Sequence, residues 1–462
     1  MILKARSSSA VGRSRSRGLQ LALCGLVMAV FSCFSRGASG QITTQMLIGD
    51  SVSEIGTRYS DVDDAIKRYA NRDIEGARLL LDSARRKDPA LPPSALILAK
   101  MHLLAGNAPA GRAALEKTAQ ENPSDPEPAL ILAGDALRTQ RIIEADALYN
   151  QGLELCSKYT ENPKRKRNLE IRARLGRAQV AEQRKNWPAA VADMQALLKI
   201  DPENATAHYR LGQALFMQKK YKEGFDELSA ARRIDKNLPD PYVPAALFYD
   251  QQGMMNEAQQ AFDRAVKNDP KDVNTLANYG QWLIKAGKLD QAEQTLAKAR
   301  ELKPQDLRVL FLSGVAARMN KKMKPAEDYF MEALRIAPGE ANTINQLALL
   351  LIEQSDEEKR NRALQFALIS SRMNAQSPDA QVTLGWVLYQ LGRTGDADAA
   401  LKNAQQLGAF SPDSNYLLAK ILVAQNRAND AKPFLREALQ AENIALFVHR
   451  QDAQALFETI NK

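Results

Sequence analysis

Prolines recur at intervals of 34 residues along this 462-residue chain. Pro89 and Pro123 are one interval apart, and a second series lies on one 34-residue grid: Pro202, Pro270, Pro304 and Pro338. Two residues after each proline of the second series stands an amide or an acid: Asn204, Asp272, Asp306 and Glu340. Proline ends one helix, and an amide or carboxylate side chain caps the next. The interval therefore predicts an array of short helical repeats that pack against their neighbours, and not one large core.

Each repeat contains two amphipathic segments joined by a tight turn. In the segment 272–287 the apolar residues have the three- to four-residue spacing of one helical face: Leu276, Tyr279, Leu283 and Ile284. Gly287 ends this segment, and glycine after a helix adopts the left-handed conformation at low cost. The segment 289–302 follows, with smaller residues on its inner face: Ala292, Leu296 and Ala299. The expected unit is a helix, a turn and a second helix.

Small and large side chains recur in phase with the repeat. Counted from each repeat start, position eight is small: Gly212, Ala246, Gly280, Gly314 and Gly385. Position twenty is alanine: Ala77, Ala145, Ala258, Ala292, Ala326, Ala397 and Ala431. Position 24 is large and apolar: Leu81, Leu115, Tyr149, Leu228, Phe262, Leu296, Phe330 and Leu401. Small residues let two helices approach closely, and the large residues fill the space that remains.

This pattern resembles the tetratricopeptide repeat (TPR), a 34-residue helix–turn–helix family. The resemblance implies an all-α fold, a right-handed α-α superhelical solenoid of about eleven TPR-like helix pairs. The repeats begin near residues 58, 92, 126, 169, 205, 239, 273, 307, 341, 378 and 412. They form two blocks, 58–157 and 169–445, separated by a basic linker at 158–168. We expect a poorly structured lead-in at 41–57, a second inserted loop at 355–362 and a terminal capping helix at 446–462.

The first 40 residues have the layout of an export signal. They contain six basic residues and no acidic one. The apolar run 19–34 is short and interrupted, whereas a membrane span needs about 20 apolar residues. Small residues at Ala38 and Gly40 precede Gln41. This layout predicts a signal peptide at 1–40 and a chain exported to the periplasm or cell envelope. The alternatives are a retained anchor, a lipidated Cys33 and an organelle transit peptide, and membrane contact is expected only with the first two.

Motifs of the common enzyme classes are absent from the sequence. It contains no Gly-x-Ser-x-Gly, no Gly-x-x-x-x-Gly-Lys-Ser/Thr, no Cys-x-x-Cys and no His-Glu-x-x-His. Of its three histidines, His102 and His208 fall on helix-packing positions, and His449 lies near the C-terminus without an evident partner. Cleavage of the leader would leave Cys156 as the single cysteine. We therefore expect no catalytic residue, no metal site and no cofactor.

A tetrad of cations is the strongest local charge feature: Lys164, Arg165, Lys166 and Arg167. Six of the nine net positive charges lie in the first 40 residues, so the overall charge only weakly indicates a polyanionic partner. The tetrad is consistent with a solvated insertion loop at 157–168, or with a loop that contacts an anionic glycan, lipid head group or other polymer. No aromatic residue is interleaved with it, so base stacking has no support and no nucleic acid is expected.

The family resemblance also implies a concave face, lined by positions two, five, nine, twelve and thirteen of each first helix. Carried over, the partner-binding candidates are Tyr209, Gln213, Phe216, Asn274, Gln281, Arg308, Phe311, Arg318, Asn345, Trp386 and Tyr389. Aromatic, amide and arginine side chains suit an extended peptide or a partner helix. Phe216 and Trp386 are equally consistent with packing inside the array. The family's carboxylate clamp is not assembled, because Gln281 stands where an asparagine is needed and the lysines are absent.

These observations predict an exported, non-enzymatic scaffold or adaptor that binds protein or peptide partners along its concave face. The step from fold to function is one of association, since a fold does not fix a function. The alternative is a polysaccharide- or polyanion-associated subunit of an envelope secretion or assembly machine. An enzyme with an unfamiliar site is the third class, and it would show turnover that a single groove substitution abolishes.

Overall fold

The computed structural model describes residues 42–52, 59–408, 410–440 and 447–461. Over these residues the regular structure consists of 24 α-helices without a strand, which confirms the prediction of an all-α fold. The chain divides into two compact units, an N-terminal unit that ends at Leu238 and a C-terminal unit that begins at Pro239. The predicted signal peptide at 1–40, with Cys33, lies outside the described residues. None of the described helices is both long and apolar enough to cross a membrane.

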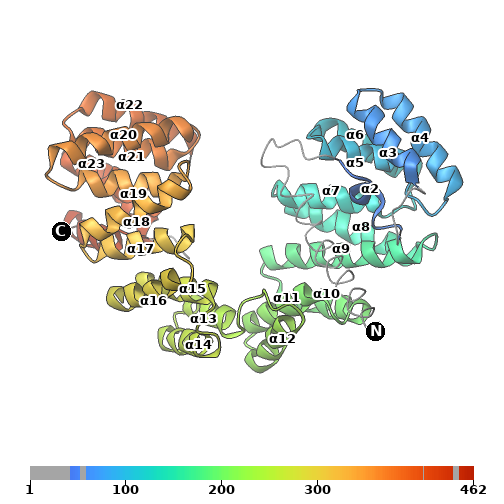
Figure 1. The fold of residues 1–462 in the computed structure, drawn as a ribbon, viewed down its shortest axis with the longest axis horizontal. Helices are drawn as coiled ribbons and strands as arrows, with labels where there is room; N and C mark the ends of the chain where they lie inside the picture. Colours follow the sequence, from blue (N-terminus) through green and yellow to red (C-terminus); the bar gives the residue numbers. More distant parts are fainter. Residues whose placement is uncertain (1–41, 53–58, 409, 441–446, 462) are drawn as a thin grey trace, which may run out of the picture. The chain divides into compact units, whose positions relative to one another are not determined.

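The N-terminal unit contains one short helix and five helix pairs (Figure 1). The short helix is α2 (Thr44–Ile48). The pairs are α3 (Ser60–Ala70) with α4 (Ile74–Lys87), α5 (Ser94–Leu104) with α6 (Ala108–Glu121), α7 (Glu127–Arg138) with α8 (Ile142–Lys158), α9 (Pro163–Gln183) with α10 (Trp187–Ile200), and α11 (Ala205–Met217) with α12 (Tyr221–Ile234). The odd-numbered helices from α3 onward are the first helices of their pairs, and their even-numbered partners are the second helices.

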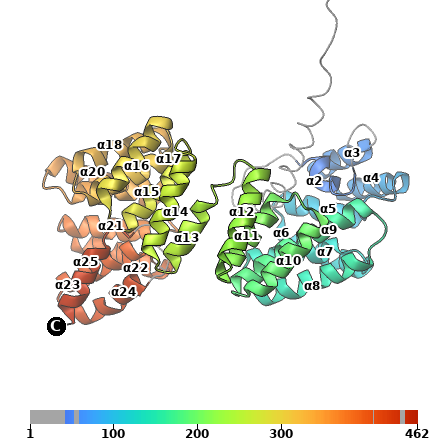
Figure 2. The same ribbon diagram turned by 90° about the horizontal axis from the view of Figure 1, so that it is seen from below.

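The C-terminal unit contains six helix pairs and a final single helix (Figure 2). The pairs are α13 (Tyr242–Gln251) with α14 (Met255–Asn268), α15 (Val273–Lys285) with α16 (Leu289–Leu302), α17 (Leu307–Met319) with α18 (Met323–Ile336), α19 (Ala341–Ile352) with α20 (Glu357–Met373), α21 (Pro378–Gln390) with α22 (Thr394–Leu407), and α23 (Pro412–Ala424) with α24 (Ala428–Gln440). The final helix is α25 (Arg450–Ile460). The described residues thus contain eleven helix pairs, the number that the repeat starts predict.

The first helices begin where the capping residues predict. Asn204 accepts a hydrogen bond from the backbone N–H of Ala207 at 2.9 Å, and Asp272 accepts one from that of Asn274 at 3.0 Å. The carboxylates of Asp306 and Glu340 cap α17 and α19 in the same way. These side chains satisfy N–H groups that have no partner within the helix.

Contact between positions eight and 24 sets the spacing between the two helices in four of the described pairs. A Cβ atom added to Gly280 would lie 2.6 Å from the Leu296 side chain, and one added to Gly314 would lie 2.5 Å from the Phe330 ring. Two further pairs repeat the contact: Gly212 with Leu228, and Gly385 with Leu401. The seven alanines at position twenty are fully buried at the same interfaces. The phased small and large residues of the sequence therefore meet directly, and the helices are as close as these side chains permit.

In ten of the eleven pairs that the structure describes, the turn contains a left-handed residue, whether or not that residue is glycine. The turn between α19 and α20 is the exception among these pairs. Gly106, Gly253, Gly287 and Gly392 have φ between 72° and 80°, as glycine allows. In six other pairs the same turn contains a non-glycine residue with positive φ: Arg72, Gln140, Lys185, Lys219, Lys321 and Asn426. A left-handed residue with a Cβ atom is costly. Packing of the two helices therefore imposes the turn, and the glycines only make it easier.

Three expected loops are more ordered than the sequence indicates, and those predictions were wrong. In the lead-in 41–57, α2 buries Leu47 and Ile48 completely. Residues 163–168 of the basic linker belong to α9, and residues 357–362 belong to α20. Both inserts lengthen a helix, because their lysines, arginines and glutamates are good helix formers and a proline or an aspartate starts each helix.

Replacing Gly314 with alanine tests the contact that spaces the helices. Alanine favours a helix over glycine by about 1 kcal/mol, but overpacking of a buried interface costs about 1–3 kcal/mol. The added methyl group would meet the rigid Phe330 ring, which is fully buried. We expect Gly314→Ala to lower the free energy of unfolding by about 1 kcal/mol, measured by urea denaturation.

Gly395→Ala is the matched control. Gly395 is a helical glycine in α22, and an added Cβ atom would have nothing within 4 Å. Here only helix propensity acts, so the free energy of unfolding should rise by up to about 1 kcal/mol. Equal stabilisation by both substitutions would show that the contact at position eight is not limiting.

Candidate binding faces

The first helices of the N-terminal unit enclose a buried network of charges. Arg165 in α9 exposes 1% of its side chain, and its Nη2 lies 2.8 Å from a carboxylate oxygen of Asp125 and 2.8 Å from one of Glu127. Nη1 of Arg165 donates to the Tyr159 hydroxyl at 2.8 Å. Lys100 in α5 reaches the fully buried Glu127 carboxylate at 2.5 Å. The network joins α5, α7 and α9.

Pairing keeps the charged form of these buried groups. Burial opposes the ionisation of Glu127, but Lys100, Arg165 and Arg172 lower its pKa well below the usual range. Burial likewise opposes the charge on Arg165, but Glu127 and Asp125 raise its pKa above the usual range. Such a network adds little net stability over an apolar core, but the loss of one member leaves an uncompensated buried charge.

The cationic tetrad is therefore not an exposed loop. Asn162 caps α9 by accepting a hydrogen bond from the backbone N–H of Arg165 at 3.0 Å. The other three cations also bond within the chain: Lys164 to the carbonyls of Gly49 and Val52, Lys166 to that of Ser157, and Arg167 to the carboxylate of Asp201. The tetrad consequently gives no support for a contact with an anionic polymer.

The C-terminal unit brings two of the predicted groove residues together. Nη2 of Arg308 in α17 donates to the Gln281 side chain at 2.8 Å and to Asn278 at 2.7 Å, and both acceptors belong to α15. Asn274 is exposed on the same helix. Arg308 is exposed as well. Its guanidinium therefore reaches from α17 to two amides of α15 and remains accessible to solvent.

Aromatic and cationic side chains form a second group on α21 and α23. The rings of Trp386 and Tyr389 stack with centroids 6.3 Å apart. Nζ of Lys420 lies 4.9 Å from the centroid of Trp386 and 5.6 Å from that of Tyr416, which are cation–π contacts. Trp386 is 5% exposed, so it is a packing residue that contacts the more exposed Tyr389 and Lys420.

A third group links the first helices α17, α19 and α23 to the C-terminal segment. Arg318 is 4% exposed and donates to the Glu353 carboxylate at 2.5 Å. His449 lies 3.2 Å from Arg318 through Nε2 and 2.7 Å from Asp413 through Nδ1. Its ring stacks on Tyr416 with centroids 5.0 Å apart. The expectation that His449 has no evident partner was wrong, because its partners lie 36 and 131 residues earlier in the chain.

These contacts shift the titration of two groups. Burial alone would lower the pKa of His449, but Asp413 and Glu353 raise it above its usual value. Burial opposes the ionisation of Glu353, but His449 and Arg318 lower its pKa to about 2. A histidinium held between two carboxylates therefore fixes the start of α25 against three first helices.

The remaining candidates divide between packing and surface positions. Phe216 is 3% exposed, and the half-buried Phe311 contacts the Phe330 ring. Tyr209 is half-buried and Gln213 is exposed, both on α11 in the N-terminal unit. Oδ1 of Asn345 in α19 is buried without a hydrogen-bond partner. Phe216, Trp386 and Arg318 are buried within their own units, which for Phe216 and Trp386 agrees with the alternative of packing inside the array.

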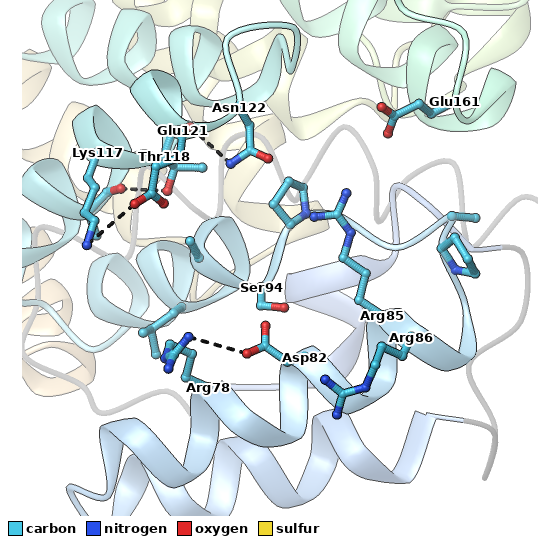
Figure 3. A pocket seen from close by; sticks show the side chains of 16 residues that line it. Arg78, Asp82, Arg85, Arg86, Ser94, Lys117, Thr118, Glu121, Asn122 and Glu161 are labelled. Atoms are coloured by element: carbon cyan, nitrogen blue, oxygen red, sulfur yellow. Dashed lines mark hydrogen bonds and ion pairs between the residues drawn. The ribbon is translucent and has the colours of Figure 1, made fainter.

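A cleft of about 980 Å³ opens between α4, α5 and α6 (Figure 3). Arg78 pairs with Asp82 at 3.5 Å, and Lys117 pairs with Glu121 at 3.6 Å. The mixture of signs along its walls does not select a cation or an anion. Elsewhere in the described part of the chain, no group of three or more histidine, cysteine or acidic side chains is placed to hold a metal ion.

Stacked helix hairpins with phased small and large residues define a helical-repeat protein. Family models described as tetratricopeptide repeat match residues 172–239, 251–312 and 382–445. These three stretches of the chain therefore contain tetratricopeptide repeats.

Two relatives come from Pseudomonas aeruginosa. A TPR repeat-containing protein is 24% identical over 206 residues, which cover 43% of this chain and 34% of that protein. The type IV pilus assembly protein PilF is 24% identical over 156 residues, which cover 33% of this chain and 62% of PilF. The chain thus covers less than two thirds of each relative. Among solved structures, yeast Tom70 aligns with 87% of this chain and 95% of its own chain, at 16% identity and a TM-score of 0.40. MamA aligns with 34% of this chain and 91% of its own chain, at 20% identity and a TM-score of 0.31.

Replacing Arg165 tests the buried network. We expect Arg165→Ala to lower the free energy of unfolding of the N-terminal unit by about 3–5 kcal/mol, because Asp125 and Glu127 would remain buried without their partner. Arg167→Ala is the control from the same tetrad, since Arg167 exposes 53% of its side chain and should change stability by less than about 1 kcal/mol. Urea denaturation measures both. Similar effects of the two substitutions would contradict the buried role of Arg165.

The His449 contacts predict a pH dependence at the C-terminal segment. The folded-state pKa of His449 lies above its unfolded value of about 6.5, so its stabilisation is complete below that pH and is lost as pH rises through the folded pKa. We expect residues 447–461 to exchange amide hydrogens faster in His449→Gln than in the unsubstituted chain at pH 6, and the ratio to approach one at pH 9. A ratio that does not change with pH would contradict the ionic contact.

Proposed function

We propose that this protein is a non-enzymatic scaffold that binds segments of partner proteins on the first-helix face of its C-terminal unit. The observation that carries the proposal is the exposed fork of Arg308, which Gln281 and Asn278 hold at 2.8 and 2.7 Å. TPR family membership supports a protein-interaction role in general terms. The particular face is argued from these side chains.

The chemistry of this face suits a peptide main chain followed by an acidic or aromatic side chain. Amide side chains donate and accept hydrogen bonds, as peptide groups do, and a guanidinium fork binds a carboxylate through two parallel bonds. Tyr389 and Lys420 add an aromatic face and a cation further along the same unit. An extended partner segment would pair its carbonyls with Asn274 and Gln281 and place an acidic group at Arg308.

The proposed location is the cell envelope, reached by export. The leader-like composition of residues 1–40 supports export, and the similarity to a type IV pilus assembly protein is consistent with the envelope. A polysaccharide- or polyanion-associated role has less support, because the cationic tetrad bonds within its own unit.

Site-specific photo-crosslinking in the native host tests the proposal. A photo-reactive amino acid at position 281 should capture partner proteins, whereas the same group at Lys298, exposed on the second helix of that pair, should not. Capture of the same proteins from both positions would contradict binding at the first-helix face.

A binding measurement with the captured segment gives the second test. We expect Arg308→Ala to weaken the affinity by at least about tenfold, because a charge-assisted hydrogen bond contributes about 1.5–3 kcal/mol. Lys298→Ala is the matched control and should leave the affinity unchanged. Calorimetry with the purified chain measures both. An affinity that Arg308→Ala leaves intact would overturn the role of the arginine fork.

A further inference from the structure

The first-helix face of the N-terminal unit already holds a peptide segment, and this segment belongs to the chain itself. Side chains of α5 and α9 donate hydrogen bonds to main-chain carbonyls of residues 47–52. The bonds run from Lys100 to Leu47 (2.9 Å), from Lys164 to Gly49 (3.3 Å) and Val52, from Asn168 to Asp50 (3.1 Å), and from Asn162 to Ser51 (2.9 Å). Five consecutive or near-consecutive carbonyls are thus bound by side chains from 53 to 118 residues away.

Two aliphatic side chains anchor the segment. Leu47 and Ile48 are fully buried in a cluster that includes Val62 of α3 and both Ile97 and Met101 of α5. On the other side of the segment, the carboxylate of Asp50 lies 3.3 Å from the guanidinium of Arg172 in α9. The contacts therefore combine main-chain recognition, an apolar pair and one acidic group.

The receptor side of this contact is built independently of the segment. Arg165, Asp125 and Glu127 pair with one another inside the unit, and Lys100 and Arg172 are held by Glu127. The segment contains only the five-residue helix α2, which is too short to be stable alone in water. A preorganised surface thus orders a segment without structure of its own, which is the usual relation between a receptor and a peptide ligand.

We propose that residues 43–52 are an intramolecular ligand, and that this face also accepts a partner segment of the same chemistry. That chemistry is a helical turn ending in two adjacent large aliphatic residues, followed by a second turn that contains an acidic residue and presents its carbonyls to the receptor side chains. The inference rests on the proposed function in one respect, that a first-helix face binds a peptide segment. Its site lies on the N-terminal unit, whereas the proposed partner site lies on the C-terminal unit. The partner and residues 43–52 compete for the same contacts.

Competition with an attached segment weakens binding from solution. A tethered segment has an effective concentration on the order of millimolar, so a free segment of equal intrinsic affinity binds only when the tethered one is released. Substitutions that weaken the tethered segment must therefore strengthen binding of a free one, whereas a purely structural segment would have no such effect.

Fluorescence anisotropy with a labelled synthetic peptide of sequence 42–52 tests the proposal on the full-length chain. We expect the peptide to bind Leu47→Ala/Asp50→Ala at least tenfold more tightly than the unsubstituted chain. Adding Lys164→Ala/Asn168→Ala to that variant should weaken binding at least tenfold. A control peptide with aspartate at the Leu47 and Ile48 positions should not bind. Absence of binding to a variant whose helical content is intact would overturn the proposal.

Hydrogen exchange on the unsubstituted chain gives a test that needs no variant. Excess peptide should increase exchange of the amides in residues 43–52 and leave α15 and α17 unchanged. Protection of residues 43–52 that excess peptide does not alter would overturn the proposal. A concentration-dependent dimer in which these residues remain protected would also overturn it, because the occupant would then be a second copy. None of these outcomes depends on Arg308, so the two proposals fail separately.

Discussion

Close contact between a small residue in the first helix and a large one in the second determines the structure of each repeat. The contacts of Gly280 with Leu296 and of Gly314 with Phe330 allow the two helices of a pair to lie close together. The buried alanines at position twenty are also small, so the second helix does not hold the first one away. The same contact recurs in the pairs of Gly212 and Gly385, so these pairs present their first helices in a similar way. Side chains on consecutive first helices consequently share one face within a unit, which brings together residues far apart in the chain.

Sequence periodicity was sufficient to predict the fold because its cause is local and repeated. Positions eight, twenty and 24 each recur several times in phase, so single exceptions do not obscure the pattern. The six non-glycine turns were beyond sequence reasoning for the opposite reason. Lys321 and Asn426 adopt a left-handed conformation that neither prefers when unconstrained, because the packed helices on both sides leave no alternative.

The charged sites could not be predicted, since their partners are distant in the sequence. Four consecutive cations at 164–167 indicate an exposed loop, yet Arg165 is 1% exposed because Asp125 and Glu127 pair with it inside the unit. These two partners lie 40 and 38 residues earlier in the sequence, so the local composition does not reveal them. His449 is a comparable case, with Arg318 and Asp413 as partners. Of the groove candidates, Asn274, Gln281 and Arg308 came from the family resemblance, while the hydrogen bond between Gln281 and Arg308 required the structure. Local composition does not reveal whether a charge is buried; the position of its counter-charge does.

The same buried charges explain why the two first-helix faces differ in availability. In the N-terminal unit, Lys100, Lys164, Asn168 and Arg172 are all engaged by residues 47–52, so recognition there requires displacement. In the C-terminal unit, Glu353 holds Arg318 and Asp413 holds His449, whereas the guanidinium of Arg308 donates to amides of its own face. Two neutral acceptors orient the Arg308 guanidinium near the Asp306 carboxylate, and an incoming carboxylate would add a charge-assisted hydrogen bond. The exposed fork on α15 and α17 is therefore the position that the proposed partner would reach without first displacing part of the chain.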